Sequence, residues 1–180
     1  IGVKYQNEDP IEIGDFASSI EHAMGGRPQL LMFEPGRMIV ANAGVLLTTV
    51  NTLKCNDQKS FAIVDAAMND LIRPSLYSAW QEVTPVTLKD DVANLERNWD
   101  IVGPVCETGD FLAKDRLLSL EEDDLLAILS AGAYGFVMSS NYNSRPRSPE
   151  VLVSGQKHNC IRKRETIEDL FALELMKPFS

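Results

Sequence analysis

The chain has 180 residues, 44% of them hydrophobic and 24% charged, with a formal net charge of −9. This is enough apolar material for a core in one domain, or in one domain plus part of another, and the negative charge argues against a nucleic-acid surface, which needs clustered lysine and arginine. No apolar run approaches the roughly 20 residues of a membrane-spanning helix and the first residues lack a signal-peptide pattern, so we expect a cytoplasmic protein with no membrane contact.

The N-terminal residues have the pattern of an α/β unit. The chain opens abruptly at Ile1-Gly2-Val3, without an initiating methionine, which we interpret as a cut within a longer protein. Apolar residues at helical spacing predict a helix from Asp15 to Met24 that ends at Gly25-Gly26, and a short apolar run predicts a buried strand from Gln29 to Phe33. A helix followed by a buried strand is one unit of an alternating α/β fold.

After Arg37 the pattern changes to strand-type runs, which predict a mainly antiparallel β domain. The predicted strands span residues 38–50, 61–65, 83–88, 99–105, 125–130, 151–153 and 158–162. Helical turns are predicted for residues 74–80, for the segment after residue 131 and for residues 166–173. Thr166 would cap the last of these, although Asp169 is a weaker partner than glutamate in a capping box. The segment from Asn141 to Pro149 is an irregular connection and a candidate functional loop.

The turn Glu34-Pro35-Gly36-Arg37 follows the predicted strand at residues 29–33. In α/β folds, ligands bind at the carboxyl ends of the strands, and this turn would aim the Arg37 guanidinium outward there. An ordinary turn with a surface arginine is the alternative, and the tetrapeptide alone does not decide between them.

Arg73 stands directly before Pro74 and four residues before Tyr77. If Pro74 opens a short helix, Arg73 and Tyr77 face the same pocket. A planar guanidinium beside a phenol suits the recognition of a carboxylate. The alternative is an arginine at a helix start that pairs with Asp70, next to a packed tyrosine.

The segment from Gly103 to Asp110 places the thiol of Cys106 beside the carboxylate of Glu107 in a turn bounded by glycines. Pro104 fixes one backbone angle and Gly109 permits a positive φ, which would hold both side chains at the tip of a loop. A buried cysteine next to a solvated glutamate is the alternative. Because the three cysteines and two histidines show no paired spacing, we expect neither a disulfide framework nor a metal site.

The segment Ala131-Gly132-Ala133-Tyr134-Gly135 surrounds one aromatic side chain with small residues. The small residues let the backbone approach a flat ligand closely while the Tyr134 ring contacts it. An aromatic plug beneath a loop is the alternative.

In this order, the four segments resemble the carboxyl-terminal half of the diaminopimelate decarboxylases, which are pyridoxal-phosphate enzymes with an alanine-racemase-like barrel. The resemblance covers nearly the whole chain and rests on EPGRMIVANAGVLLT, VDAAMNDLIRPSLY, GPVCETGDFLAKDR and SAGAYGFVMSSNYNSRPR. It implies a lyase of lysine biosynthesis that converts meso-diaminopimelate to L-lysine and carbon dioxide.

The resemblance also implies which residues bind the cofactor and the substrate. The cofactor, pyridoxal 5'-phosphate, would be bound by Glu34, Pro35, Gly36, Arg37 and Tyr134. The substrate would be bound by Arg37, Arg73, Tyr77, Glu107 and Tyr134, with its distal carboxylate at Arg73 and Tyr77.

Two further roles follow from the resemblance. Cys106 would be the catalytic acid that protonates the carbanion left by decarboxylation, and Glu107 would bind the distal ammonium of the substrate. Both would be donated across the interface of a homodimer. A substrate with two amino-acid ends needs a guanidinium and an anion, and Arg73 with Glu107 supplies both signs.

The lysine that forms the Schiff base in the family lies on an early barrel strand and has no counterpart in this sequence. We therefore expect residues 1–36 to be the end of a truncated (β/α)8 barrel and residues 37–180 to form a C-terminal β domain, as a barrel or sandwich. The fold class expected is mainly β with a short α/β piece at the N-terminus, and the chain by itself is expected to be inactive.

Two other functions stay open at this point. A related decarboxylase acting on ornithine or arginine is disfavoured by the Cys106-Glu107 pair, because those relatives usually carry aspartate after the cysteine. A noncatalytic binding or dimerisation module is compatible with the isolated chain.

Overall fold

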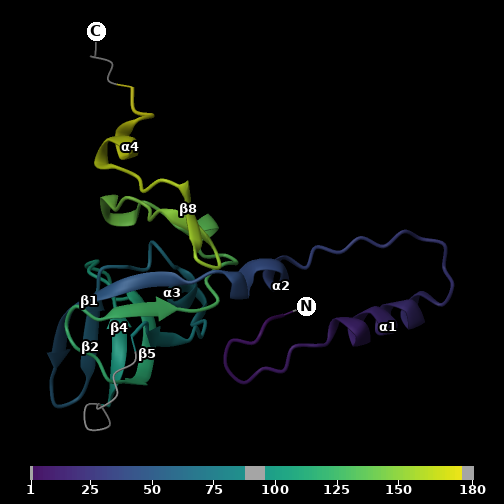
Figure 1. The fold of residues 1–180 in the computed structure, drawn as a ribbon, viewed down its shortest axis with the longest axis horizontal. Helices are drawn as coiled ribbons and strands as arrows, with labels where there is room; N and C mark the ends of the chain where they lie inside the picture. Colours follow the sequence, from purple (N-terminus) through teal and green to yellow (C-terminus); the bar gives the residue numbers. More distant parts are fainter. Residues whose placement is uncertain (1, 88–95, 176–180) are drawn as a thin grey trace.

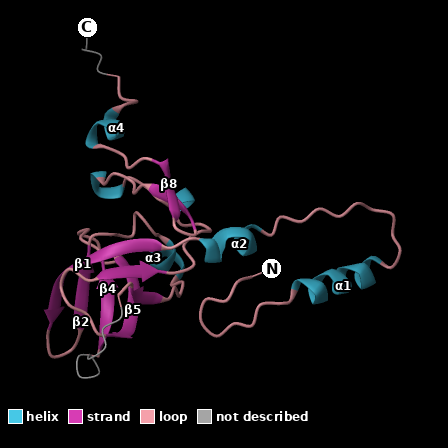
Figure 2. Cartoon of the chain, viewed as in Figure 1, coloured by secondary structure: helices cyan, strands magenta, loops and turns pink. Residues whose placement is uncertain are grey.

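The computed structural model describes residues 2–87 and 96–175 (Figure 1). Its helices are α1 (Ile13–Met24), α2 (Gly36–Val40), α3 (Arg73–Tyr77) and α4 (Ile167–Phe171), with 3-10 turns η1 (Ala41–Ala43), η2 (Phe136–Met138) and η3 (Tyr142–Ser144). Its strands are β1 (Leu46–Cys55), β2 (Ser60–Val64), β3 (Val83–Pro85), β4 (Arg97–Val102), β5 (Phe111–Leu118), β6 (Leu125–Ile128), β7 (Glu150–Ser154) and β8 (Lys157–Arg162). Most strands gather in one part of the molecule, whereas α1 lies beyond α2 at the end of a long extended segment (Figure 2).

Six strands form one sheet in the order β3-β6-β1-β2-β4-β5, and β7 pairs with β8 in a separate hairpin. Neighbours in the large sheet are antiparallel except β2 and β4, which run parallel. The two edge strands, β3 and β5, also contact each other, so the sheet curls almost into a closed barrel. The prediction of a mainly β domain with barrel character is confirmed.

The core lies inside this curled sheet. Burial alternates along β2, where every second residue is buried, as expected for a strand with one face turned inward. The fully buried apolar side chains come from all six strands of the sheet and from the segment before α3: Val50, Val64, Leu71, Val83, Ile101, Leu112, Leu126 and Ile128. The loops and short helices that carry the candidate site are attached to this rigid framework.

The N-terminal helix is as predicted, but the strand after it is not. Helix α1 ends at Gly25, which has a φ of 55°. Residues 29–33 are extended without a strand partner in the described part of the chain, and Leu30 and Met32 are 88% and 86% exposed. The predicted strand at 29–33 is therefore wrong, because an apolar run forms a strand only beside a neighbour that pairs with its backbone. Of the short α/β piece predicted at the N-terminus, the helix forms and the strand does not.

The strand predicted for residues 38–50 is wrong in its first half, where α2 and η1 precede β1. A close approach by the backbone of Gly132 explains the difference. The Gly132 amide donates to the Ala41 carbonyl at 3.0 Å, and the Ala131 amide donates to the Gly44 carbonyl at 2.8 Å. A Cβ on Gly132 would collide with the Val40 carbonyl. Contacts between distant segments, not local strand preference, set this conformation.

The remaining elements agree with expectation at most positions. Strand β3 ends at Pro85, earlier than predicted, and residue 88 lies outside the described residues. Thr166 caps α4, and its amide donates to Asp169 Oδ2 at 2.7 Å, so the capping box forms with aspartate. Strand β5 was not predicted.

None of the helices in the described ranges has the length and apolar character needed to cross a membrane.

Candidate functional site

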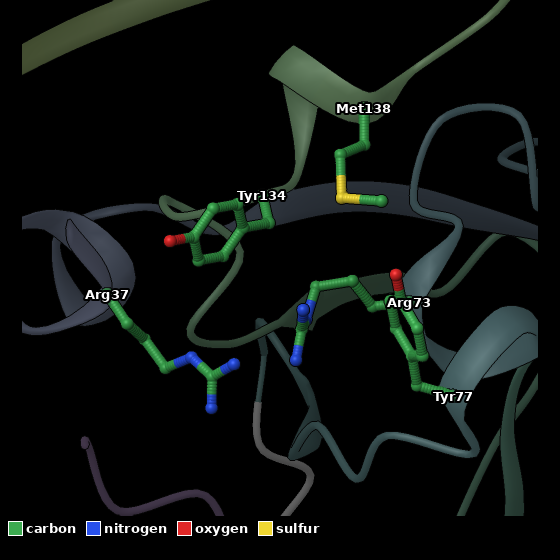
Figure 3. Close-up of a pocket in the computed structure, with 5 residues that line it drawn as sticks. All are labelled: Arg37, Arg73, Tyr77, Tyr134 and Met138. Carbon is green, nitrogen blue, oxygen red and sulfur yellow. The ribbon is translucent and has the colours of Figure 1, made fainter.

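A cavity of about 570 Å³ lies where α2, α3 and the segment after β6 meet. Figure 3 shows its lining side chains, which come from these three parts of the chain: Arg37, Arg73, Tyr77, Tyr134 and Met138. Among the described residues, the lining includes two guanidinium groups and no carboxylate. The structure therefore brings together the arginines and tyrosines singled out in the sequence, in a setting suited to an anionic ligand.

Arg73 is the most buried charged group of this cavity, with 9% of its surface exposed. It opens α3 directly before Pro74, as predicted. Its guanidinium carbon lies 5.4 Å from the ring centroid of Tyr77 and 5.6 Å from that of Tyr134. The Nε of Arg73 is buried and has no hydrogen-bond partner among the described residues. An unpaired buried donor costs about 1–3 kcal/mol unless an acceptor from outside the described residues satisfies it.

The alternative pairing of Arg73 with Asp70 is not observed. Asp70 instead forms an ion pair with Arg145, at 3.5 Å between Oδ2 and Nη2. Burial raises the pKa of the Asp70 carboxyl, and the charge of Arg145 opposes this shift. The guanidinium of Arg73 is thus left to the cavity.

Arg37 and Tyr134 form the opposite wall. The Arg37 guanidinium carbon lies 5.9 Å from the Tyr134 ring centroid and 5.7 Å from that of Tyr5. Tyr134 has a left-handed backbone, with a φ of 58°, which is uncommon for a residue with a Cβ. A Cβ on Gly36 would lie 2.9 Å from the Tyr134 hydroxyl. The absence of a side chain at Gly36 is what lets α2 begin so close to the ring.

Cys106 and Glu107 lie elsewhere, on the turn between β4 and β5, and both are exposed. They do not line the cavity of Arg37 and Arg73. The buried carboxylate of Asp110 organises this turn by accepting from the amides of Met68 and Val105, each at 2.7 Å. The cysteine and the glutamate are therefore at the tip of a fixed loop, as predicted.

The glycines of this turn act differently from expectation. Gly109 does not use the positive φ that a glycine permits, since the described glycines with positive φ are Gly25, Gly26 and Gly155. Gly103 is needed instead because a Cβ there would collide with the Asp110 carboxylate. The Ser75 hydroxyl of α3 bonds to the Gly109 carbonyl and ties the turn to the helix of Arg73.

The irregular segment after η2 also contacts this turn. The Tyr142 hydroxyl donates to Glu107 Oε2 at 3.3 Å. Arg145 donates to Asn69 Oδ1 at 2.9 Å and to the Asp65 carbonyl at 2.6 Å, which fastens the segment to the loop after β2. The sequence predicts an irregular connection at 141–149 and a candidate functional loop, but it assigns no role to Tyr142 or Arg145.

Met138 and Asp110 were also not predicted as part of the site. Met138 lines the cavity beside Tyr134, but methionine carries no chemical signal that separates a lining residue from a core residue. In the sequence, Asp110 is only the last residue of the predicted turn. The signal that identifies its role is an acidic residue next to a glycine in a loop with several free amides.

Comparisons with known proteins identify relatives of this chain. Residues 13–132 match the family model described as "Pyridoxal-dependent decarboxylase, C-terminal sheet domain". The chain is 60% identical over 178 residues to a diaminopimelate decarboxylase of Pseudomonas fluorescens, covering 99% of this chain and 42% of the relative. The chain thus spans about 42% of the length of these curated relatives.

Solved structures show the same fold. Diaminopimelate decarboxylase from Helicobacter pylori, complexed with L-lysine, superposes with a TM-score of 0.88 at 46% identity and covers 97% of this chain and 42% of that protein. Lysine/ornithine decarboxylase from Vibrio vulnificus, complexed with cadaverine, reaches a TM-score of 0.70 at 22% identity over 81% of this chain and 40% of that protein, which indicates a shared fold only.

Proposed function

This chain belongs to the pyridoxal-dependent decarboxylases through their C-terminal sheet domain, and on this premise we propose that it supplies that domain to an enzyme converting meso-diaminopimelate to L-lysine and carbon dioxide. The observation that carries the proposal is Arg73, a buried guanidinium with an unpaired Nε between two tyrosine rings. The names of the relatives and the L-lysine bound to the Helicobacter pylori protein support the same substrate.

The cavity fits pyridoxal 5'-phosphate as the cofactor. Two cations in the lining suit its phosphate and the carboxylates of an amino acid, and the missing side chain at Gly36 leaves the Tyr134 ring reachable. We assign cofactor binding to Glu34, Pro35, Gly36, Arg37 and Tyr134. When bound, the cofactor serves as the electron sink for decarboxylation.

Arg37, Arg73 and Tyr77 bind the substrate in this proposal. A guanidinium matches a carboxylate with two parallel hydrogen bonds, and the Tyr77 hydroxyl adds a third donor. The low exposure of Arg73 makes its pairing selective. A substrate without the distal carboxylate would leave this guanidinium unpaired, which costs about 1–3 kcal/mol.

Cys106 and Glu107 complete the site of a second copy of the protein. Because both are exposed and lie away from the cavity of their own chain, they are available to a neighbouring subunit. There the Cys106 thiol delivers a proton to the carbon that has lost its carboxylate. The Glu107 carboxylate binds the distal ammonium of the substrate, opposite in sign to Arg73.

The proposal is tested with a reconstituted enzyme, in which this chain replaces the matching 42% of the Pseudomonas fluorescens relative. We expect it to release carbon dioxide from meso-diaminopimelate and to form L-lysine, with the unmodified relative as the control. Preferred turnover of ornithine or arginine would favour the related decarboxylases. A folded dimer that turns over none of these substrates would favour a binding or dimerisation module.

A further inference from the structure

One hydrogen bond joins the Cys106 turn to the segment after η2, which the proposed function leaves without a role. Tyr142, in η3, donates its hydroxyl to Glu107 Oε2 at 3.3 Å. The other oxygen, Oε1, accepts from the Gly109 amide at 3.3 Å. Both oxygens of this exposed carboxylate are therefore held from fixed points, although glutamate is a flexible side chain that solvent would otherwise leave mobile.

Both ends of the bond between Tyr142 and Glu107 are anchored on the same short segment, residues 65–70. On one side, the Met68 amide donates to Asp110, which shapes the Cys106 turn. On the other side, the Asn69 side-chain Nδ2 donates to the Ser140 carbonyl at 3.1 Å, and the Ser140 amide donates to the Asn69 carbonyl at 3.0 Å. The phenol and the carboxylate are thus positioned relative to each other by a common support.

The backbone next to Tyr142 is held in an unfavourable conformation. Asn143 and Ser144 both lie in the left-handed region, with φ of 56° and 54°. Residues with a Cβ rarely adopt this conformation, and it persists where surrounding contacts fix it. Here the Asn141 side chain donates to the Arg145 carbonyl at 3.0 Å, and Arg145 is bound in turn to Asn69. The strained turn directs the Tyr142 ring toward Glu107.

From this geometry we infer that Tyr142 is a positioning residue that orients the Glu107 carboxylate toward the second amine of the substrate. The inference rests on the proposed function and adds a determinant of specificity to it. Tyr142 holds one oxygen by a single bond and leaves lone pairs on both oxygens free to accept from an ammonium. The negative charge of Glu107 raises the pKa of Tyr142, so the phenol keeps its proton and remains a donor.

The test is Tyr142→Phe in the reconstituted enzyme, which removes the hydroxyl and keeps the ring. We expect the KM for meso-diaminopimelate to rise about tenfold, as for a lost hydrogen bond to a charged group, with kcat within about twofold. An unchanged KM, or equal changes in KM and kcat, would overturn the inference. Thermal unfolding checks that the variant is folded.

Two further variants separate positioning from general loop damage. Ser139→Ala removes a side-chain hydrogen bond to the Phe136 carbonyl just before the same segment, without touching Glu107 or the residues that hold Tyr142, and its KM should stay near that of the parent. In a Glu107→Ala background, Tyr142→Phe should have no additional effect, because the bond has lost its acceptor. Independent, additive effects of the two substitutions would contradict the inference.

The two proposals fail in different ways. If the reconstituted enzyme does not act on meso-diaminopimelate, the proposed function is wrong and the role of Tyr142 is wrong with it. If the enzyme acts on this substrate and Tyr142→Phe leaves KM unchanged, the proposed function stands and the role of Tyr142 alone is wrong.

Discussion

Arg73 is a buried cation: 9% of its surface is exposed to solvent, and its Nε has no acceptor among the described residues. Aromatic rings at 5.4 and 5.6 Å compensate part of the lost hydration through cation–π attraction. Rings offer no hydrogen-bond acceptor in the guanidinium plane, however. In the proposed function a planar anion supplies that acceptor, and a carboxylate matches the fork of donors best.

We expect Arg73→Lys in the reconstituted enzyme to raise the KM for meso-diaminopimelate by about 10- to 100-fold, because an ammonium cannot form the paired hydrogen bonds of a guanidinium. Steady-state kinetics measure the effect. Arg97→Lys, an exposed arginine at the start of β4, is the matched control and should leave KM unchanged. Similar kinetics for the two variants would remove Arg73 from the substrate site.

Cys106→Ala should mainly affect turnover. A proton donor acts in the transition state, so we expect kcat to fall by about 10²- to 10⁴-fold while KM changes little. Cys55→Ala is the control, because Cys55 is also exposed but lies at the end of β1. Equal losses in kcat and substrate affinity would indicate that Cys106 contributes to packing instead.

At the residue scale, the sequence identifies side chains with distinctive chemistry and misses those that act through position. Arg37, Arg73 and Tyr134 were predicted because charged and aromatic residues in tight turns are conspicuous, and they meet in one cavity. Met138 completes that cavity but resembles any core methionine. The role of Gly103 depends on the approach of Asp110, a contact that local sequence does not reveal.

At the scale of elements, Glu165 fastens the segment before α4 to the loop of Tyr142. It accepts from the Asn141 side chain at 2.6 Å, and from the side chain and the amide of Arg147 at 2.7 and 2.8 Å. These hydrogen bonds, chiefly that of the Arg147 side chain, lower the pKa of Glu165 from 4.5 to about 2. The folded state therefore favours the charged carboxylate more strongly than the unfolded state does.

Because the pKa is lower in the folded state, the stabilisation by Glu165 is complete above about pH 4.5 and is lost as the pH falls toward 2. We expect the parent to be more stable than Glu165→Gln at about pH 6 and the difference to shrink over this range. Unfolding midpoints of both proteins across the range measure it. Glu174→Gln, an exposed glutamate beyond α4, is the control and should differ little from the parent at any pH. A difference for Glu165→Gln that does not depend on pH would contradict the prediction.

The errors in the predicted elements have identifiable physical causes. Strand β5 was missed because Lys114, Asp115 and Arg116 interrupt its apolar pattern, and its pairing with β4 shifts register where the strand is irregular. Arg116 is nevertheless buried, since its guanidinium stacks 3.1 Å from the Trp80 ring centroid and closes the sheet toward β3. Strands with a regular alternation, such as β2, were predicted within a residue of their ends.

At the scale of the whole molecule, the sheet domain buries its own core, but large apolar side chains remain exposed along several segments, including those before α2 and after α4. Leu30 and Met32 precede α2 and are 88% and 86% exposed, whereas Leu173 and Leu175 follow α4 and are 96% and 82% exposed. Large exposed apolar patches mark contacts with other protein surfaces. In the proposed enzyme a second copy is also required, because Cys106 and Glu107 lie away from the cavity of their own chain.

We therefore expect residues 1–180, produced alone, to self-associate through residues 30–33, and light scattering across a concentration series measures the mass. The double variant Leu30→Glu and Met32→Glu should shift the population toward monomer, because burying two new carboxylates in an apolar contact is costly. Leu173→Glu with Leu175→Glu is the matched control, with equal charge added beyond α4. A stable monomer of the parent at high concentration would contradict self-association, and an equal effect of the two double variants would contradict its location.

If the N-terminal variant becomes monomeric and keeps its unfolding midpoint, this segment contributes to association and not to the stability of the sheet, which is consistent with the lack of buried residues in α1.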